Sequence, residues 1–386
     1  MSEHLTAAAV DDATAIRIRI PWARPSVGDD EADAARAAIA ESALSMGTRV
    51  AAFEEEMAEH SEREHGVAVC NGTDALELAV TLAGIAPGDE VLVSALSYIA
   101  TVNCLVRAGI VPVFCDVDPA TLNIDPEEIA RRVTPRCTAV LVSDYCGFAL
   151  DYGRVEQQCE EHGLCLLNDG AQAIGTKSDG RPTLSRGLVA TTSFHAAKVM
   201  TTGEGGMVFV DDTDLAERAR RLRGQGEVPG AKYIHSILGG NHRMTDFQAA
   251  IGLVQLRRLG EMQQARARQA ARYAAGLAGH PHIAMPETRP GTVPSWFSFP
   301  ILVDGRDVVA ADLRSDGIET RSLYPIPTYR QPIPEYPRVT TELPIAEWAC
   351  ARVLNLPMFF DLSDSDLDEV VASVLDSLDR HAERSG

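Results

Sequence analysis

The residue with the most distinctive chemistry in this sequence is Lys198. It lies in an apolar segment, SFHAAKVM (193–200), which is followed by the glycine-rich TTGEGG (201–206). Most lysines lie on solvated faces, so a lysine in this setting is unusual. Burial lowers the pKa of a lysine and makes its neutral amine a nucleophile toward carbonyl carbons. We therefore interpret Lys198 as a residue for covalent chemistry, whereas His195 by itself is more typical of a packed core residue.

An acidic residue, Asp169, ends another apolar run, LLNDGAQ (166–172). In open α/β sheets, ligands gather beyond the carboxyl ends of the strands. A carboxylate at that point could pair with the cationic ring nitrogen of a cofactor. The alternative is an aspartate that caps the helix after the strand, and the motif taken alone favours this cap.

A third segment, NGTDAL (71–76), joins a strand-like run to an apolar helical pattern. Glycine allows close approach of the backbone to a ligand, and the free N–H groups of a helix N-terminus bind anions. The hydroxyl of Thr73 adds a donor. An ordinary helix cap explains the same residues and is favoured when the segment is taken alone.

Short apolar runs alternate with helical patterns through the first half of the chain. This alternation predicts an α/β fold with a mostly parallel sheet that helices cover on both faces. We expect a large domain over 1–245, then a connecting helix and a smaller C-terminal α+β domain over 246–386. Gly260 could bend or break the connecting helix. Strands are expected at 66–70, 90–94, 111–116, 139–143, 165–167, 207–210 and within 296–304, and helices at 49–65, 74–83, 98–107, 125–132, 245–277 and 364–381.

Composition narrows the classes of function. The 386 residues include 35 Lys and Arg against 55 Asp and Glu, a net charge of −20, which disfavours nucleic-acid and membrane partners. No apolar run approaches the ~20 residues that span a bilayer, and the acidic N-terminus does not resemble a secretory signal. The eight cysteines are scattered without a C-x-x-C pair. We therefore expect reduced thiols, a cytoplasmic protein and no metal site.

The order and spacing of the three segments match the fold type I pyridoxal-phosphate enzymes, and the chain closely resembles the DegT/StrS-type sugar aminotransferase family. The resemblance covers nearly the whole sequence and is most specific in the segment that contains Lys198. It implies a large domain with a mixed, mostly parallel seven-stranded sheet, and pyridoxal 5′-phosphate as cofactor. The matching segments are LSMGTRVAAFEEEMAEH, CNGTDALELA, SALSYIATVN, VPVFCDVDPATLNID, LLNDGAQAIGT, SFHAAKVMTTGEGGMV, NHRMTDFQAAIGLVQL and VLNLPMF.

The resemblance assigns a role to each matching residue. Lys198 matches the lysine that links covalently to the cofactor aldehyde and later moves the substrate proton. Asp169 matches the acid that keeps the ring nitrogen protonated, which makes the ring an electron sink. The cofactor contacts that it implies are Gln172 to the phenolic oxygen, Tyr98 stacked on the ring, and Gly72, Thr73 and Ser193 at the phosphate.

Asn241 matches an asparagine that reaches the phosphate from the neighbouring subunit, which implies a homodimer with shared active sites. A helix or loop cap is the alternative for Asn241, and core packing is the alternative for Tyr98. His195, Tyr329 and Lys232 are the expected substrate contacts, although His195 could instead fill the pocket. Glu204 is expected to shape the glycine turn.

The implied activity is an aminotransferase that converts a keto-sugar, nucleotide-activated in the leading interpretation, into an amino-sugar. Glutamate or glutamine would be the donor, in a biosynthetic or secondary-metabolite pathway such as that of an antibiotic. One alternative is a non-nucleotide ketone such as a keto-cyclitol, and another is a non-catalytic regulator that binds the cofactor.

Two features bear on the choice of substrate. A basic cluster of Lys232, His242 and Arg243 near the cofactor would favour a diphosphate. Three positions depart from histidines that are frequent in the family. These are Asp144 and Tyr329, both expected near the substrate, and Phe359.

Overall fold

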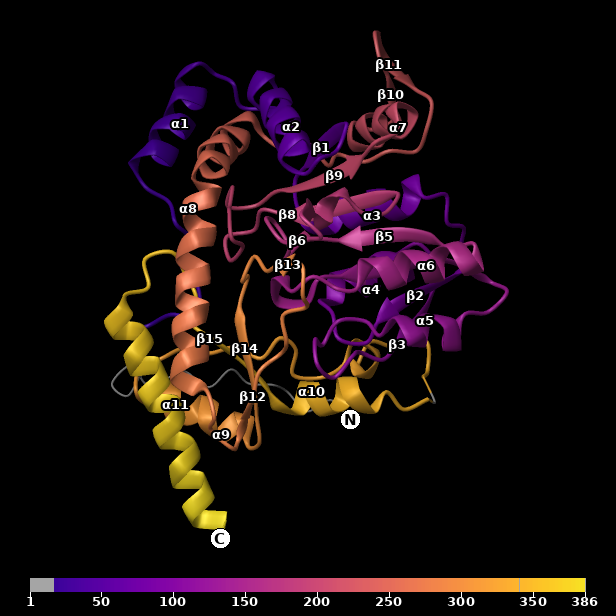
Figure 1. Ribbon diagram of the computed structural model, residues 1–386. Coiled ribbons are helices and arrows are strands. Elements are labelled where there is room, and N and C mark those ends of the chain that lie inside the picture. The colour runs from indigo at the N-terminus through magenta and orange to yellow at the C-terminus, as the bar shows by residue number, and fades with distance from the viewer. Residues whose placement is uncertain (1–16, 340, 386) are drawn as a thin grey trace, which may run out of the picture.

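The computed structural model describes residues 17–339 and 341–385 (Figure 1). The predictions about the chain before residue 17 lie outside these residues. A seven-stranded sheet has the order β1-β9-β8-β5-β4-β2-β3, in which β9 is antiparallel to both neighbours and the other adjacent pairs are parallel. The predicted mixed, mostly parallel sheet is confirmed. Its strands are β1 (His65–Val69), β2 (Glu90–Ser94), β3 (Val111–Cys115), β4 (Cys137–Ser143), β5 (Cys165–Asp169), β8 (Val189–Ser193) and β9 (Gly206–Val210).

Successive residues of a strand point to opposite sides of the sheet, so a continuous apolar run presents apolar side chains on both faces. Helices cover both of these faces. On one face, Val91 and Val93 share a core with helices α3 (Gly72–Leu82) and α4 (Ile99–Arg107). On the other face, Leu92 packs with helices α5 (Pro126–Arg132) and α6 (Tyr152–His162). The strands are therefore apolar on both faces, which is why they appear in the sequence as continuous apolar runs.

The C-terminal part contains a second sheet, with the order β12-β14-β15, and helices that pack on it. Its elements are β12 (Ile283–Ala284), β14 (Phe299–Val303), α9 (Arg306–Ser315), β15 (Val353–Leu356) and α11 (Asp364–Ser385). The long helix α8 (Asp246–Leu277) runs between the two parts (Figure 1). Helix α10 (Pro344–Arg352) instead joins the large-sheet core, and Asp116 after β3 accepts hydrogen bonds from the N–H groups of Ile345 and Ala346.

The remaining elements are short or peripheral. Within the described residues, none of the helices is long and apolar enough to cross a membrane. The remaining helices are α1 (Asp29–Ala40), α2 (Thr48–His60) and α7 (Thr213–Arg223), with 3-10 turns η1 (Tyr145–Gly147), η2 (Thr183–Ser185) and η3 (Thr328–Arg330). The short strands are β6 (Lys177–Ser178), β7 (Arg181–Pro182), β10 (Glu227–Val228), β11 (Ala231–His235) and β13 (Thr292–Val293).

Two expectations need correction. The helix predicted at 49–65 ends at His60, because Glu62 takes a left-handed conformation and the buried Arg63 donates to the carbonyls of Leu184 and Arg186. Gly260 does not break α8, since an unstrained helix continues through it. Strands β8 and β15, helices α1, α6, α7, α9 and α10, and the two-residue and hairpin strands have no counterpart in the predicted elements.

Candidate active site

Most of the predicted cofactor-binding residues converge at one edge of the large sheet. Strands β1, β2, β4, β5 and β8 all end at this edge, because β9 alone runs the other way. Ligands of open α/β sheets bind beyond such carboxyl ends. The segments that follow these strands contain Gly72, Tyr98, Cys146, Gln172 and Lys198.

The N-terminus of α3 presents backbone donors at this edge. The side chain of Asn71 accepts from the N–H of Asp74 at 2.8 Å, and the carbonyl of Asn71 accepts from Ala75. The N–H groups of Gly72 and Thr73 have no recorded acceptor within the described residues. A Cβ on Gly72 would lie 2.7 Å from the Cβ of Ser193, so only glycine permits this approach. The two N–H groups and the Ser193 hydroxyl form a cradle suited to a phosphate.

The carboxylate of Asp169 lies at the end of β5, with 5% of the residue exposed. Burial raises its pKa above the ordinary value, while hydrogen bonds from Thr101 and from the N–H of Ala171 lower it, and the charge of Lys198 lowers it further. Thr101 donates at 2.7 Å and Ala171 at 3.1 Å. These donors orient the carboxylate and favour its charged form, which a cationic ring nitrogen requires as its partner.

The amine of Lys198 follows β8 on a tight turn, where the backbone N–H of Lys198 donates to the carbonyl of His195 at 2.9 Å. Burial lowers the pKa of Lys198 to about 8, against the opposing effects of Asp169 and Cys146, which raise it. Its Nζ lies 4.6 Å from the ring centroid of Phe297. An amine with this pKa has a substantial neutral, nucleophilic population near neutral pH.

The side-chain amide of Gln172 is held at both ends. Its Oε1 accepts from the backbone N–H of Cys146 at 2.8 Å, and its Nε2 donates to the hydroxyl of Tyr324 at 3.1 Å. The amide nitrogen is thereby directed toward Tyr324, whose ring lies 5.9 Å from that of Tyr98. Tyr98 is 54% exposed, so one face of this site is open to a planar ligand.

The other predicted site residues lie elsewhere or have local partners. His195 is exposed, its Nδ1 accepts from the N–H of Ala197 at 3.2 Å, and its Nε2 lies 3.8 Å from Glu204. Asn241 is exposed and its Oδ1 accepts from Arg243. The hydroxyl of Tyr329 donates to Glu347.

Lys232 lies on the hairpin of β10 and β11, which projects from the body of the molecule, with its Nζ 5.1 Å from the Tyr233 ring (Figure 1). Among the described residues, no recorded contact joins Lys232 to His242 or Arg243. His242 pairs with Asp74, and Arg243 pairs with Asn241. The basic cluster that would favour a diphosphate is therefore not assembled within one chain.

Two of the positions that depart from the family pattern are structural. Asp144 is fully buried, and its oxygens accept from the N–H of Leu150 at 3.0 Å and the hydroxyl of Tyr152 at 2.9 Å. The expectation that Asp144 faces the substrate is corrected, because a ligand cannot reach it in this conformation. Phe359 is buried beneath the guanidinium of Arg24, which lies 4.6 Å from its ring.

Sequence reasoning missed four residues of the site. Thr101, Cys146, Phe297 and Tyr324 each touch a predicted residue from a different segment. Thr101 lies in the matching segment SALSYIATVN but was assigned no role there, and Cys146, Phe297 and Tyr324 lie in none of the matching segments. Phe297 and Tyr324 come from the C-terminal part of the chain. Only the fold brings them to the sheet edge.

The assembled residues fit pyridoxal phosphate. The anion cradle, the buried carboxylate, the amine of lowered pKa and the oriented amide lie at one edge, beside an exposed aromatic ring. They define a cofactor-dependent enzyme of the aminotransferase class. Residues 25–375 match the DegT/DnrJ/EryC1/StrS aminotransferase family. The chain belongs to this family and is a pyridoxal-phosphate-dependent aminotransferase, as the resemblance implied.

Several relatives align over most of their length. The chain is 38% identical over 340 residues to GDP-perosamine synthase of Caulobacter vibrioides, covering 86% of this chain and 90% of that protein. It is 35% identical over 375 residues to dTDP-4-dehydro-2,3,6-trideoxy-D-glucose 4-aminotransferase of Saccharopolyspora spinosa, covering 93% and 96%. A pleiotropic regulatory protein of Geobacillus stearothermophilus is 35% identical over 333 residues, covering 85% of this chain and 89% of that protein.

The fold agrees with solved structures. The aminotransferase TlmJ from Streptoalloteichus hindustanus superposes with a TM-score of 0.89 and is 35% identical, covering 94% of this chain and 99% of that one. The predicted fold class, a fold type I transferase with a large α/β sheet, is confirmed.

Proposed function

We propose that this aminotransferase converts a ketone on a nucleotide-activated sugar into an amine, with glutamate or glutamine as donor. The observation that carries the proposal is the intact set of Lys198, Asp169 and Gln172 in a chain that aligns over 86–93% of its length with relatives named for GDP- and dTDP-sugars. A biosynthetic pathway for amino-sugars, such as those of antibiotics, fits this activity.

The mechanism assigns a task to each residue. Pyridoxal phosphate supplies a ring that takes up the electron pair left when a substrate carbon loses its proton. Lys198 Nζ would hold the cofactor aldehyde between turnovers and would accept the proton from the amino-bearing carbon of the donor. Asp169, supported by the hydrogen bond from Thr101, would keep the ring nitrogen protonated. Gln172 would donate to the phenolic oxygen, and the cradle of Gly72, Thr73 and Ser193 would hold the phosphate.

Two alternatives remain testable. A free ketone such as a keto-cyclitol would need no basic cluster, and His242 and Arg243 are paired within the chain. The relatives named for GDP- and dTDP-linked sugars count against this alternative. A regulator without catalysis is suggested by the name of the Geobacillus relative. The intact Lys198 and Asp169 count against the regulator, because a sensor does not require a proton-transferring amine.

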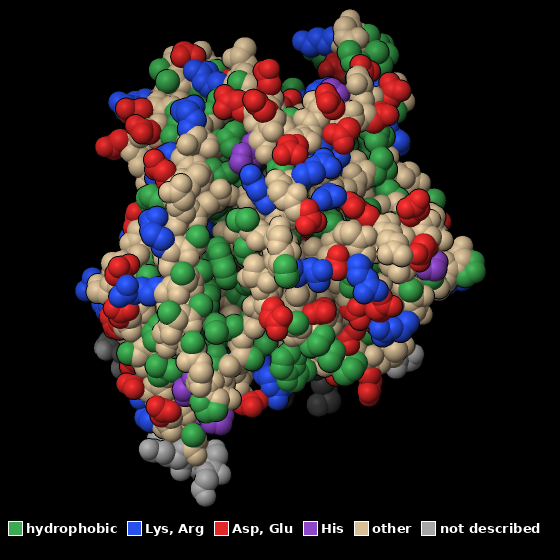
Figure 2. Space-filling model, in the orientation of Figure 1, with side chains coloured by type: hydrophobic (Ala, Val, Ile, Leu, Met, Phe, Trp, Pro, Cys, Tyr) green, Lys and Arg blue, Asp and Glu red, His purple; other side chains and the backbone are tan. Residues whose placement is uncertain are grey.

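We further infer a homodimer with shared sites. Asn241 is exposed, and the adjoining hairpin and the segment after it display Tyr233, Ile234 and Leu238 with 76%, 59% and 97% exposure. Apolar side chains so exposed on a projecting element are typical of a surface that another chain covers. Apolar side chains are visible on this projection at the upper right of Figure 2.

Location and domain organisation complete the proposal. All eight cysteines are free, which supports a cytoplasmic enzyme. The two-part organisation, 1–245 and 246–386, is supported by the separate core around β14, although α10 packs on the large sheet. His195, Tyr329 and Lys232 are retained as substrate contacts, with Lys232 acting on the site of the partner subunit.

The substrate assignment is tested with the amino-loaded form of the enzyme. Keto-sugar nucleotides and free keto-cyclitols are added in turn, and discharge of the amino form is followed by absorbance. Discharge by a nucleotide-linked ketone at catalytic rates supports the proposal. Discharge only by free cyclitols establishes the first alternative, and no discharge by any ketone, with the cofactor bound, supports the regulator.

The shared site is tested by complementation. Asn241→Ala weakens phosphate binding, and mixing it with Lys198→Ala chains restores partial activity, since one mixed site combines both native residues. An active monomer at dilution, or no restoration after verified subunit exchange, rules out the shared site.

A further inference from the structure

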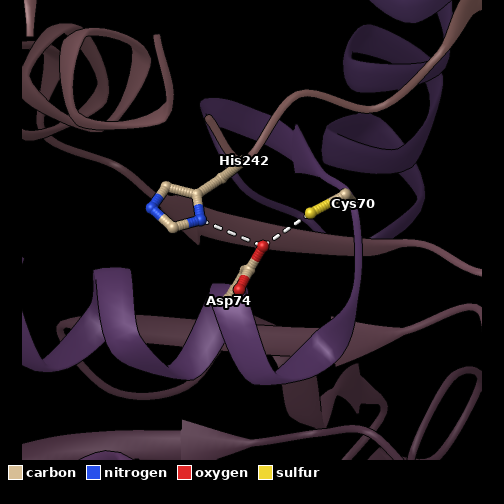
Figure 3. A group of neighbouring side chains, drawn as sticks. All are labelled: Cys70, Asp74 and His242. Atoms are coloured by element: carbon tan, nitrogen blue, oxygen red, sulfur yellow. Dashed lines mark hydrogen bonds and ion pairs between the residues drawn. The ribbon is translucent and has the colours of Figure 1, made fainter. Parts of the chain in front are cut away.

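Three side chains outside the proposed catalytic set point toward one another beside the N-terminus of α3 (Figure 3). Cys70 follows β1, Asp74 is in the first turn of α3, and His242 precedes α8. The Sγ of Cys70 lies 2.5 Å from Oδ2 of Asp74, and Nδ1 of His242 lies 3.0 Å from the same oxygen. One ligand atom from each residue lies within 4.8 Å of the other two.

The backbone holds these residues on a rigid frame. The N–H of Cys70 donates to the carbonyl of His242 at 2.9 Å, and Val69 forms an antiparallel bridge with Arg243. Asp74 is fixed by its N–H bond to Asn71 at 2.8 Å. Because the three backbones are tied together, the ligand atoms converge without any movement of the chain, as a preorganised site requires.

The donor set has the chemistry of a zinc site. A thiolate, an imidazole and a carboxylate are ligands that Zn²⁺ takes in proteins, and bonds of about 2.0–2.3 Å place tetrahedral ligands about 3.3–3.8 Å apart. Side-chain rotations that separate the three ligand atoms by about 1 Å more, with the backbone unchanged, would accommodate the ion. One thiolate and one carboxylate neutralise its charge. All three residues are half-buried, which leaves a side open for water.

We propose that Cys70, Asp74 and His242 bind one Zn²⁺ through Sγ, Oδ2 and Nδ1, with water as the fourth ligand. The absence of a C-x-x-C pair argues only against zinc sites whose ligands are neighbours in sequence. Cys70, Asp74 and His242 instead come from the position after β1, the first turn of α3 and the segment before α8. On binding, the sulfur–hydrogen bond of Cys70 breaks, a zinc–sulfur bond forms, and the proton leaves to solvent.

The position of the site suggests what the ion does. It lies between the helix that presents the N–H groups of Gly72 and Thr73 and the loop that contains Asn241. Bound zinc ties this loop to the helix.

The test measures zinc on the holoenzyme. After removal of metals with a chelator, the protein is dialysed against zinc chloride and its metal content and zinc-edge X-ray absorption are determined. We expect one zinc per chain, with one sulfur at about 2.3 Å and nitrogen or oxygen at about 2.0–2.1 Å. Binding is also expected to release the thiol proton of Cys70, one per zinc, which is measured as a fall in pH in unbuffered solution.

Variants locate the ion. Cys70→Ser and His242→Gln each weaken zinc binding at least tenfold, while Cys165→Ser, a half-buried cysteine at the start of β5, leaves it unchanged. Cofactor content verifies the fold of each variant. Three results would overturn the proposal and leave a hydrogen-bonded cluster. These are loss of the zinc on dialysis against zinc-free buffer, an X-ray absorption spectrum without a sulfur ligand, or retention of as much zinc by Cys70→Ser as by the wild type. If a variant fails to fold, the X-ray absorption spectrum of the wild-type protein tests the proposal by itself.

Discussion

The pKa of Lys198 sets how fast the enzyme without its cofactor captures pyridoxal phosphate. Burial lowers this pKa from 10.5 to about 8, a change that Asp169 opposes. At pH 7 about a tenth of such amines are neutral, against about 3 in 10,000 for a free lysine, a gain of about 300-fold. The covalent capture rate is therefore expected to rise about tenfold per pH unit up to pH 8 and to level off above it.

The assay mixes the cofactor-free enzyme with pyridoxal phosphate in a stopped-flow spectrometer between pH 6 and pH 10. The reaction of Nα-acetyl-lysine under the same conditions corrects for the titration of pyridoxal phosphate itself. Asp169→Asn removes the carboxylate that stabilises the ammonium form, so the midpoint moves below pH 8. Borohydride reduction then fixes the label on Lys198.

Two results would refute this reasoning. A rate that still rises tenfold per unit beyond pH 9.5 would mean that Lys198 titrates as an ordinary lysine. A midpoint that moves upward in Asp169→Asn would mean that the carboxylate does not stabilise the ammonium form.

The other predictions concern support of the site and packing. Thr101→Val removes the hydrogen bond to Asp169 and raises the pKa of that acid further, so kcat falls about tenfold and the acidic limb of its pH profile moves upward; an unchanged profile contradicts this. In α8, Gly260→Ala is expected to raise the free energy of unfolding in urea by ~0.5–1 kcal/mol, because the added Cβ meets no other atom. Gly252→Ala is expected to lower it by about 1–3 kcal/mol, because the added Cβ would lie 2.7 Å from the Phe53 ring. Changes of the same sign in both variants would contradict this packing argument. Burial raises the pKa of Asp144 to about 6, so the folded chain loses up to about 3 kcal/mol of stability as pH rises from about 4 to 6. Asp144→Asn therefore raises the urea midpoint at pH 8 much more than at pH 4, and an equal gain at both would show that desolvation is not the cause.

Local sequence determined the elements and the reacting groups. Continuous apolar runs mark strands that are buried on both faces, so six of the seven large-sheet strands were predictable. The unpredicted β8 contains VATTS, whose threonines are buried but polar. Lys198 was recognisable because a lysine in an apolar run has a local physical signature. Asp169 and Gly72 taken alone favoured helix caps, and it was the order and spacing of the three segments that assigned them to the cofactor.

Tertiary structure alone decided what surrounds those groups. Thr101, Cys146, Phe297 and Tyr324 reach the site from separate segments, and pairing across such distances leaves no periodic trace in the chain. The same holds for Asp144, whose burial against Tyr152 depends on how α6 packs. Cys70, Asp74 and His242 meet because Val69 at the end of β1 forms an isolated bridge with Arg243 in the segment before α8, a long-range contact that no local spacing encodes.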